Sequence, residues 1–343
     1  MKEKYIRGKA GILVFTGISL AVLFTFSSLN QGLAEEPFTV KVSLLPYISY
    51  APIFIALEEG YFSEQGLRIE LIRFSRGGQS MPALVRGHLD VTADTTGASL
   101  FAAIARGSNI RIVADKGHLD PTCTYIAIMV RKDLHDSGEV TAIEQLKGRK
   151  VSLGSITNWG YIYEKILSKG CLTLEDIEIV RMPASAQIEA FATGAIDAAS
   201  TGDPLITQLE TLGYAVKLAK YEDFVPDYQS ASIVFGPSLI GKNRKQGRKF
   251  MIAYLKGVRQ YNEGKTMRNI KIFQKYTGLD TDILNKICLP PVSSDGNINT
   301  ESILTVQDWM YENGYIDNKV TLDQLIDMSF AEYANEVLER KDM

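Results

Sequence analysis

The sequence predicts an α/β protein with two similar lobes, because one stretch of the chain recurs as a rough copy about 108 residues later. The copied pieces keep their order and spacing: 41–44 (KVSL) and 150–153 (KVSL), 69–73 (IELIR) and 177–181 (IEIVR), 87–91 (GHLDV) and 194–198 (GAIDA). Strand-like and helix-like periods alternate within each copy, which is typical of a mostly parallel sheet covered by helices. We expect the two lobes to face each other across a cleft that carries the function.

The first copy contains four predicted strands and three predicted helices. Alternating or clustered apolar residues predict the strands, and a period near 3.6 predicts the helices. The strands span 38–45, 67–74, 88–93 and 110–114, and the helices span 51–59, 79–86 and 99–106. Gly60 directly follows the first helix, in the position where glycine commonly ends one.

The second copy repeats this series, and a helical C-terminal region follows it. After a β-rich run at 124–130, its strands span 150–153, 177–181 and 196–200, and its helices span 161–168, 186–193 and 204–212. A β-rich run at 231–235 comes next. Beyond it a helical period predicts helices at 244–263, 267–276, 281–287, 303–313 and 322–337.

The C-terminal helices have no counterpart in the repeat, so they must pack on one lobe or on both. If they pack on the first lobe, the chain crosses between the lobes twice, near 124–130 and near 228–235. A double crossover limits relative motion to opening and closing about a hinge. We therefore expect 35–127 plus 233–343 to form lobe 1, and 128–232 to form lobe 2.

The first residues have the pattern of a secretory signal peptide. A basic start is followed by an apolar run at 12–26 and by small residues before a predicted cut after Ala34. The alternative is an uncleaved membrane anchor, but the apolar run is short for a span of about 20 residues. We expect residues 1–34 to be removed on export.

Composition excludes several classes of function. The formal net charge is −3 and no basic tract is present, which disfavours binding to nucleic acid or to anionic lipid. The histidines share no metal-ligand spacing, so we expect neither a metal nor another cofactor. Cys123, Cys171 and Cys288 allow at most one disulfide, and we favour buried single thiols over a bridge.

Ligands of parallel α/β sheets bind beyond the carboxyl ends of the strands, against helix N-termini. The repeat places these ends at 46–50, 75–79 and 94–97 in the first lobe, and at 154–159, 183–187 and 201–204 in the second. Free backbone N–H groups at such helix starts attract anions. The candidate ligand residues are Tyr47, Tyr50, Gly78, Gln79, Thr95, Thr96, Ser155, Asn158, Trp159 and Asp203.

Each candidate also has a purely structural interpretation. Tyr50 and Trp159 occupy equivalent positions and could sandwich a flat ligand, or each ring could pack on its own lobe. Ser155 and Asn158 could simply cap a helix, and Gly78 could belong to a turn. Asp203 suits an N-cap before Pro204, although in the cleft it would suit an amine or a ring N–H group.

The motifs quoted next resemble those of a known family. They are 55–62 (IALEEGYF), 87–91 (GHLDV), 146–151 (LKGRKV) and 190–198 (AFATGAIDA), followed by Asp203-Pro204. Over about 40–330 the chain resembles periplasmic solute-binding proteins of ABC importers. It is similar to the branch that carries nitrate, alkanesulfonates, taurine and pyrimidine precursors of thiamine. These motifs are mostly turns and helix ends, so they specify the fold better than the ligand.

The resemblance implies a type II periplasmic binding fold, a small-molecule ligand, a periplasmic location and a monomer. It also implies delivery to an inner-membrane permease and, through it, to a cytosolic ATPase. Eukaryotic relatives that synthesise a pyrimidine carry a cysteine-rich motif, which this chain lacks. Together with the absence of G-x-S-x-G, H-E-x-x-H and C-x-x-C motifs, this disfavours an enzyme.

The ligand class stays open between two chemistries. Helix N-termini favour a small organic anion such as a sulfonate or carboxylate, whereas the aromatic residues and Asp203 favour a nitrogen heterocycle. We favour the anion. A periplasmic sensor that passes the closed form to a receptor is a further alternative.

Overall fold

The computed structural model describes residues 36–45, 47–74 and 79–342. The predicted signal peptide and Gly78 lie outside these residues. Within the described ranges, no helix is long and apolar enough to cross a membrane.

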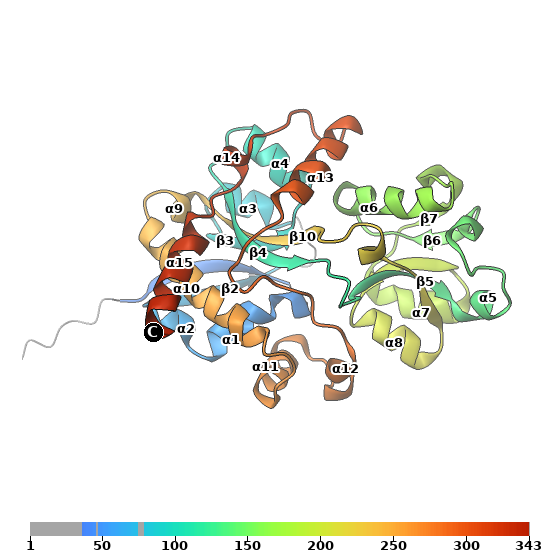
Figure 1. The fold of residues 1–343 in the computed structure, drawn as a ribbon, viewed down its shortest axis with the longest axis horizontal. Coiled ribbons are helices and arrows are strands. Elements are labelled where there is room, and N and C mark those ends of the chain that lie inside the picture. Colours follow the sequence, from blue (N-terminus) through green and yellow to red (C-terminus); the bar gives the residue numbers. More distant parts are fainter. Residues whose placement is uncertain (1–35, 46, 75–78, 343) are drawn as a thin grey trace, which may run out of the picture. The chain divides into compact units, whose positions relative to one another are not determined.

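The first sheet combines four strands of the first copy with one strand from beyond the second copy (Figure 1). Its order is β2-β1-β3-β10-β4. β1 pairs in parallel with β2 and β3, whereas β10 is antiparallel to β3 and β4. The strands are β1 (Phe38–Leu44), β2 (Leu67–Arg73), β3 (Val91–Thr95), β4 (Arg111–His118) and β10 (Gln229–Phe235).

The second sheet has the same plan, with the order β7-β6-β8-β5-β9. β5 is antiparallel to β8 and β9, and thus holds the place that β10 holds in the first sheet. The strands are β5 (Ile126–Arg131), β6 (Lys150–Ser152), β7 (Glu178–Val180), β8 (Ala198–Gly202) and β9 (Ala215–Lys220). The predicted α/β fold with two similar sheets is confirmed, and the sheets are mixed because β10 and β5 return antiparallel.

Helices flank both sheets (Figure 1). Those of the first copy are α1 (Ala51–Glu58), α2 (Tyr61–Glu64), α3 (Met81–Val85) and α4 (Ala98–Ala105). The second copy has α5 (Lys132–Asp136), α6 (Ile156–Lys169), α7 (Gln187–Thr193) and α8 (Leu205–Leu212). The extra helices are α9 (Pro237–Ile240), α10 (Arg244–Tyr261), α11 (Met267–Thr277), α12 (Thr281–Lys286), α13 (Thr300–Glu312), α14 (Leu322–Leu325) and α15 (Ser329–Asp342).

Five short 3-10 helices complete the described elements. They are η1 (Ile48–Tyr50), η2 (Ile143–Leu146), η3 (Leu174–Asp176), η4 (Ala184–Ala186) and η5 (Tyr221–Asp223). η1 leads directly into α1, so it lies between the end of β1 and the first helix of the repeat.

The repeated glycine-x-x-aspartate turn has one structural role in both copies. Asp90 accepts a hydrogen bond from the backbone N–H of Lys41 at 2.9 Å, and Asp197 accepts one from Lys150 at 3.0 Å. Each aspartate thereby ties the start of its strand to the neighbouring strand. Both are turn residues, as the sequence predicted.

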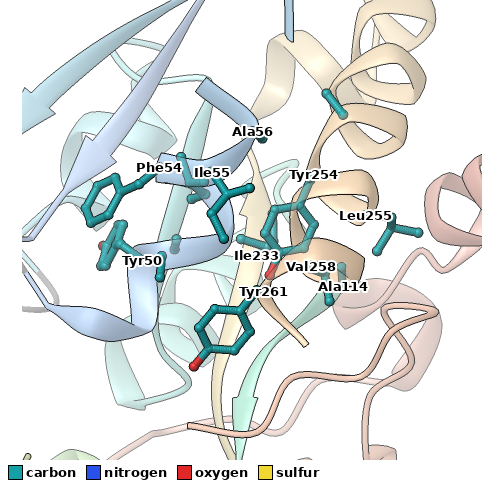
Figure 2. Packing of buried hydrophobic residues seen from close by; sticks show 14 of the residues in the cluster. Tyr50, Phe54, Ile55, Ala56, Ala114, Ile233, Tyr254, Leu255, Val258 and Tyr261 are labelled. Atoms are coloured by element: carbon teal, nitrogen blue, oxygen red, sulfur yellow. The ribbon is translucent and has the colours of Figure 1, made fainter. Parts of the chain in front are cut away.

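The core of the first sheet lies between the sheet and a layer formed by α1, α10, α11 and α15. Figure 2 shows Phe54 and Ile55 of α1 beside Tyr254 and Val258 of α10. These side chains are buried and belong to one apolar cluster. A side chain of Leu, Ile or Phe size contributes roughly 1.5–3 kcal/mol when it is fully buried, so this layer fixes α1 on the sheet.

The C-terminal helices contact elements of both sheets. α12 packs against α8, while α13 packs against α4 and α6. The indole N–H of Trp309 in α13 donates to Glu164 in α6 at 2.7 Å, and the same ring fills the space beside Gly160. The closeness of Trp309 leaves no room for a Cβ at position 160. These helices therefore connect the two sheets beyond the strand crossovers.

The chain contains one disulfide among its three cysteines, so the interpretation of three buried single thiols was wrong. Cys123 and Cys288 are bonded, with their Cα atoms 5.7 Å apart, and Cys171 is free and exposed. The bond joins the segment between β4 and β5 to the segment after α12. Their separation of 165 residues explains why spacing alone did not reveal the pair.

Candidate functional site

The carboxyl ends of strands in the two sheets approach each other at one contact. Gly97 is the N-cap of α4, two residues after the end of β3, and Asn158 lies in the first turn of α6 after β6. The side chain of Asn158 lies so close to Gly97 that a Cβ there would collide with it. Both segments belong to the loops in which ligand residues were predicted.

The predicted residues of the first sheet differ in accessibility. Tyr47 is 52% exposed and Gln79 is exposed, so both side chains reach solvent. Thr95 is half-buried at the end of β3. Thr96 is buried, and its hydroxyl lies 3.1 Å from that of Ser232 in β10.

Tyr50 is buried rather than presented to solvent. Only 1% of its surface is exposed, and its ring stacks on Phe54 with centroids 6.3 Å apart. Its hydroxyl is buried and has no hydrogen-bond partner among the described residues. Burial, followed by the charge of Asp94, raises the pKa of this hydroxyl above its usual range, against the smaller opposing effect of the nearby Ser43 side chain and Leu45 backbone. The phenol is therefore neutral and keeps a proton to donate.

Ser155 and Asn158 lie at the start of α6. Ser155 holds the N-cap position, but its hydroxyl lies 2.9 Å from that of Thr157 and does not bond a backbone N–H group. The backbone carbonyl of Asn158 accepts from the hydroxyl of Tyr228 at 3.4 Å. The exposed hydroxyls of Ser155 and Thr157 remain accessible to a ligand.

Trp159 is half-buried and packs on aromatic residues near the second sheet. Its ring lies edge-on to Tyr221 at 6.3 Å and tilted against Tyr228 at 6.0 Å. Tyr50, its counterpart in the repeat, packs on Phe54 in the core of the first sheet. The structure thus brings each of these rings onto local partners and shows no stacking of the two on each other.

Asp203 is engaged in two structural contacts. One carboxylate oxygen accepts from the hydroxyl and backbone N–H of Thr207, at 2.8 and 3.2 Å, near the start of α8. The other accepts from the backbone N–H of Cys288 at 2.9 Å. Burial raises the pKa of Asp203, and these hydrogen bonds oppose that rise. Asp203 links the end of β8 to the disulfide segment.

A neutral polar network at the second sheet was not predicted from the sequence. The hydroxyl of Ser200 lies 2.6 Å from that of Tyr221 and accepts from Tyr163 at 3.3 Å. Gln187 donates to Ser152 at 3.3 Å, and its buried amide oxygen has no partner among the described residues. Only Gln187 lies in a loop that the repeat had singled out.

Lys116 in β4 was also missed, and it is a buried cation. It is 4% exposed, its ammonium donates to the hydroxyl of Ser49 at 2.9 Å, and it lies 4.2 Å from the centroid of the Tyr50 ring. Burial lowers the pKa of Lys116 to about 8, against the opposing effect of Asp94 and Asp115. A lysine that continues an apolar strand is the signal that could have revealed it.

The neighbouring Asp115 is fully buried and fully bonded. Its carboxylate accepts from the side chains of His118 and Gln229, at 2.8 and 2.7 Å. It also accepts from the backbone N–H groups of Gly117 and Ser293, at 2.7 and 2.8 Å. The hydrogen bond to Asp115 raises the pKa of His118. This network joins β4 and β10 to the segment before α13.

A hollow of about 500 Å³ lies beside the second sheet, at the end away from the carboxyl ends of its parallel strands. It is lined by Arg131, at the end of β5, and by Gly194 and Gly213, where α7 and α8 end. Arg131 is paired with Asp133 and Asp197. The hollow is therefore remote from the strand ends that carry the candidate residues. Among the described residues, no cluster of His, Cys, Asp and Glu is suited to hold a metal ion.

A family model described as NMT1/THI5-like matches residues 48–263, which is more than half of the chain. The chain belongs to the NMT1/THI5-like family. The matched span covers both sheets' parallel strands except β1, and it includes Tyr50, Lys116, Trp159 and Asp203.

Several relatives of this NMT1/THI5-like protein carry names that refer to binding. A protein of Brucella abortus (strain 2308) that is named as a binding protein is 26% identical over 277 residues. The match covers 78% of this chain and 79% of the relative. The periplasmic aliphatic sulphonate binding protein of Escherichia coli has a TM-score of 0.68 at 19% identity, over 85% of this chain and 92% of its own.

Two other solved structures share the fold at low identity. The periplasmic nitrate-binding protein of Synechocystis PCC 6803 has a TM-score of 0.69 at 14% identity, over 89% of this chain and 90% of its own. A desulfurization enzyme has a TM-score of 0.64 at 15% identity, over 88% of this chain and 99% of its own. At these identities the likeness concerns the fold alone.

Proposed function

We propose that this protein is the substrate-binding component of an ABC import system. It captures a small organic solute between the two sheets and delivers it to an inner-membrane permease driven by a cytosolic ATPase. The single observation that carries this proposal is the contact of Gly97 with Asn158. It brings the carboxyl ends of β3 and β6 together, where ligands of such sheets bind.

The two sheets would act as two lobes that open and close. We propose lobe 1 as 35–127 plus 233–343 and lobe 2 as 128–232, with the hinge in the two crossings between them. The strand order supports two such lobes, since β10 completes the first sheet after the chain has built the second, although β10 begins at Gln229, before the proposed boundary at 233. Moving such a switch from 1:99 to 99:1 needs a preference of about 10⁴-fold for the closed form.

The ligand we favour is a sulfonate or carboxylate. The carboxylate of Asp203 already accepts from Thr207 and Cys288, which weakens the case for an amine or a ring N–H group at that position. Ser155 and Thr157 keep exposed hydroxyls at the start of α6. A pyrimidine precursor of thiamine, or another nitrogen heterocycle, is the alternative ligand.

The predicted signal peptide and the family support a periplasmic location for this binding protein. We propose that it works as a monomer, without a cofactor and without catalytic turnover. Several relatives named for binding support this, whereas the likeness to the desulfurization enzyme is one of fold.

A thermal melting scan tests the proposal. The panel contains butanesulfonate, benzoate, nitrate and an uncharged aminopyrimidine. A bound solute stabilises the native state by RT ln(1 + [L]/Kd), so a solute at 100 times its Kd contributes about 2.7 kcal/mol. A rise in Tm with an anion supports the proposed ligand class, and a rise with the aminopyrimidine alone supports the heterocycle. No rise with any of them contradicts solute capture by this site.

Two rival functions make different predictions. An enzyme would convert the bound solute, so recovering that solute unchanged after prolonged incubation excludes turnover. A sensor would pass its closed form to a receptor instead of a permease. If the solute-loaded protein stimulates ATP hydrolysis by the reconstituted permease and ATPase, transport is favoured over sensing.

A further inference from the structure

The strand ends of the first sheet contain a buried cation that is incompletely satisfied. An ammonium group has three N–H donors, and that of Lys116 uses one of them on the hydroxyl of Ser49. No carboxylate of the described residues forms an ion pair with it. Leaving a buried charge without a paired anion is costly, so an anionic group that reached the ammonium would be stabilised there.

The negative side chains nearby are committed elsewhere. Asp115 is saturated by its four hydrogen bonds. Asp94 accepts from the backbone N–H of Thr95 at 2.8 Å and from Ser80 at 3.4 Å, and it has a further interaction besides. Both carboxylates favour the charged form of Lys116 from a distance. Neither takes up the remaining donors of the ammonium.

A second donor without a partner lies next to this cation. The Tyr50 hydroxyl is buried and unpaired among the described residues, and the ring of the same residue lies under the Lys116 ammonium. Ring and ammonium hold each other in place, because a cation over an aromatic face is attracted to it. The ammonium of Lys116 and the O–H group of Tyr50 are thus fixed in one region; the O–H group has no acceptor among the described residues, and the ammonium has Ser49 alone.

We propose that Lys116 and Tyr50 form the subsite that receives the oxyanion end of the ligand. The inference rests on the proposed function and adds the group that reads the ligand's charge. Ser49 positions the ammonium, and Tyr47, two residues before Ser49 in the chain, is 52% exposed. A carboxylate or a sulfonate supplies the acceptors that both donors lack, and an uncharged heterocycle does not.

Isothermal titration calorimetry at pH 7 tests the subsite with the anion that binds most tightly in the melting scan. Lys116→Met removes the charge and keeps an unbranched apolar side chain. It is expected to weaken anion binding about 10- to 100-fold, the factor that a charge-assisted hydrogen bond commonly carries. Tyr50→Phe removes one oxygen without changing the packing, and is expected to weaken binding about 3- to 10-fold.

Lys220→Met is the matched control, because it removes the same charge from the equivalent edge strand of the second sheet, where the side chain is exposed. It is expected to change the affinity less than about twofold. The melting temperature of unliganded Lys116→Met is expected to equal or exceed that of the wild type, since a buried charge is removed.

The results separate the subsite from the wider function. If the wild type binds an anion and both Lys116→Met and Tyr50→Phe bind it equally well, the subsite is wrong and the solute-binding function stands. If Lys116→Met does not fold, the Tyr50→Phe result alone decides. Binding of the aminopyrimidine alone also overturns the subsite. Binding of no compound contradicts the proposed function, and the subsite falls with it.

Discussion

The two sheets have equivalent strand orders, but the side chains at the carboxyl ends of their parallel strands differ in charge. In the first, the ammonium of Lys116 lies over the ring of Tyr50; in the second, Tyr221 lies against Trp159. Tyr50 and Trp159 are equivalent in the repeat, and β4 and β9 are equivalent in the strand orders. Equivalent places are thus occupied by the buried cation Lys116 at the first sheet and by the neutral phenol of Tyr221 at the second.

Strand register extends the comparison to the neighbouring positions. Ser232 in β10 is flanked by Asp94 and Asp115. Its counterpart Ala127 in β5 is flanked by Thr201 and Lys220. The first end therefore holds three buried charged side chains where the second holds hydroxyl groups and an exposed lysine. Duplication preserved the turns and strand order, while the polar groups at the strand ends diverged.

The largest difference between the ends is expected at Asp115. Asp115→Ala removes the acceptor of four hydrogen bonds and leaves His118 and Gln229 without it. Breaking a buried pair in this way costs about 3–5 kcal/mol. Denaturant unfolding should report that loss, whereas Lys220→Ala at the matching position should stay within about 0.5 kcal/mol. Equal losses would mean that the two ends do not differ in buried charge.

The buried lysine gives the first end its own pH dependence. The pKa of Lys116 falls from 10.5 in the unfolded chain to about 8 in the folded one. Between these values the unfolded chain binds more protons, so this group makes the native state more stable as the pH rises. The wild type should gain about 2 kcal/mol over Lys116→Met between pH 7 and 9.5. Parallel stability curves for the two proteins would contradict a buried Lys116.

The contact between α13 and α6 can be altered by a substitution that makes the two copies of the repeat more alike. Gly160 occupies the place of Ala51 in the repeat, and Trp309 fills the space that a methyl group would need. Gly160→Ala is expected to cost about 1–3 kcal/mol through overpacking. Ala51→Gly, the reverse change in the first copy, should cost about 0.5–1 kcal/mol as a helix substitution. A neutral Gly160→Ala would show that Trp309 moves aside freely.

The smallest difference is expected where the copies agree. Asp90→Ala and Asp197→Ala each remove one hydrogen bond to a backbone N–H group, worth about 0.5–1.5 kcal/mol. The losses in unfolding free energy, compared by thermal unfolding, should match within about 0.5 kcal/mol. A difference of that size is allowed because Asp197 also has a weak contact with Arg131. A loss confined to one copy would show that the shared turn has separate roles.

The sequence predicted what is local and repeated. The period of apolar residues and the glycine-x-x-aspartate turns determine strands and helices within each copy, and these were found. The strand at 110–114 was predicted too short, because β4 continues through Asp115, Lys116 and His118 to residue 118. Charged residues normally end a buried strand, and here tertiary partners satisfy Asp115 and His118, while Lys116 donates to Ser49 alone. The sequence could not anticipate those partners.

The candidate site was predicted as a set of loops and not as a set of contacts. The burial of Tyr50 depends on the helices that pack around α1. The hydrogen bond from the backbone N–H of Cys288 to Asp203 joins segments 85 residues apart. The disulfide between Cys123 and Cys288 likewise depends on where α12 packs. Such contacts arise from the C-terminal helices, which have no copy and therefore no internal reference in the sequence.

The position of the ligand's charged group tests the central claim most directly. A crystal structure of the complex with the anion that binds most tightly would locate it. We expect an oxygen of the anion about 2.7–2.9 Å from Nζ of Lys116, within reach of the Tyr50 hydroxyl, and the remainder of the ligand toward Trp159. An anion that contacts only residues of the second sheet, and neither Lys116 nor Tyr50, would contradict the proposed subsite.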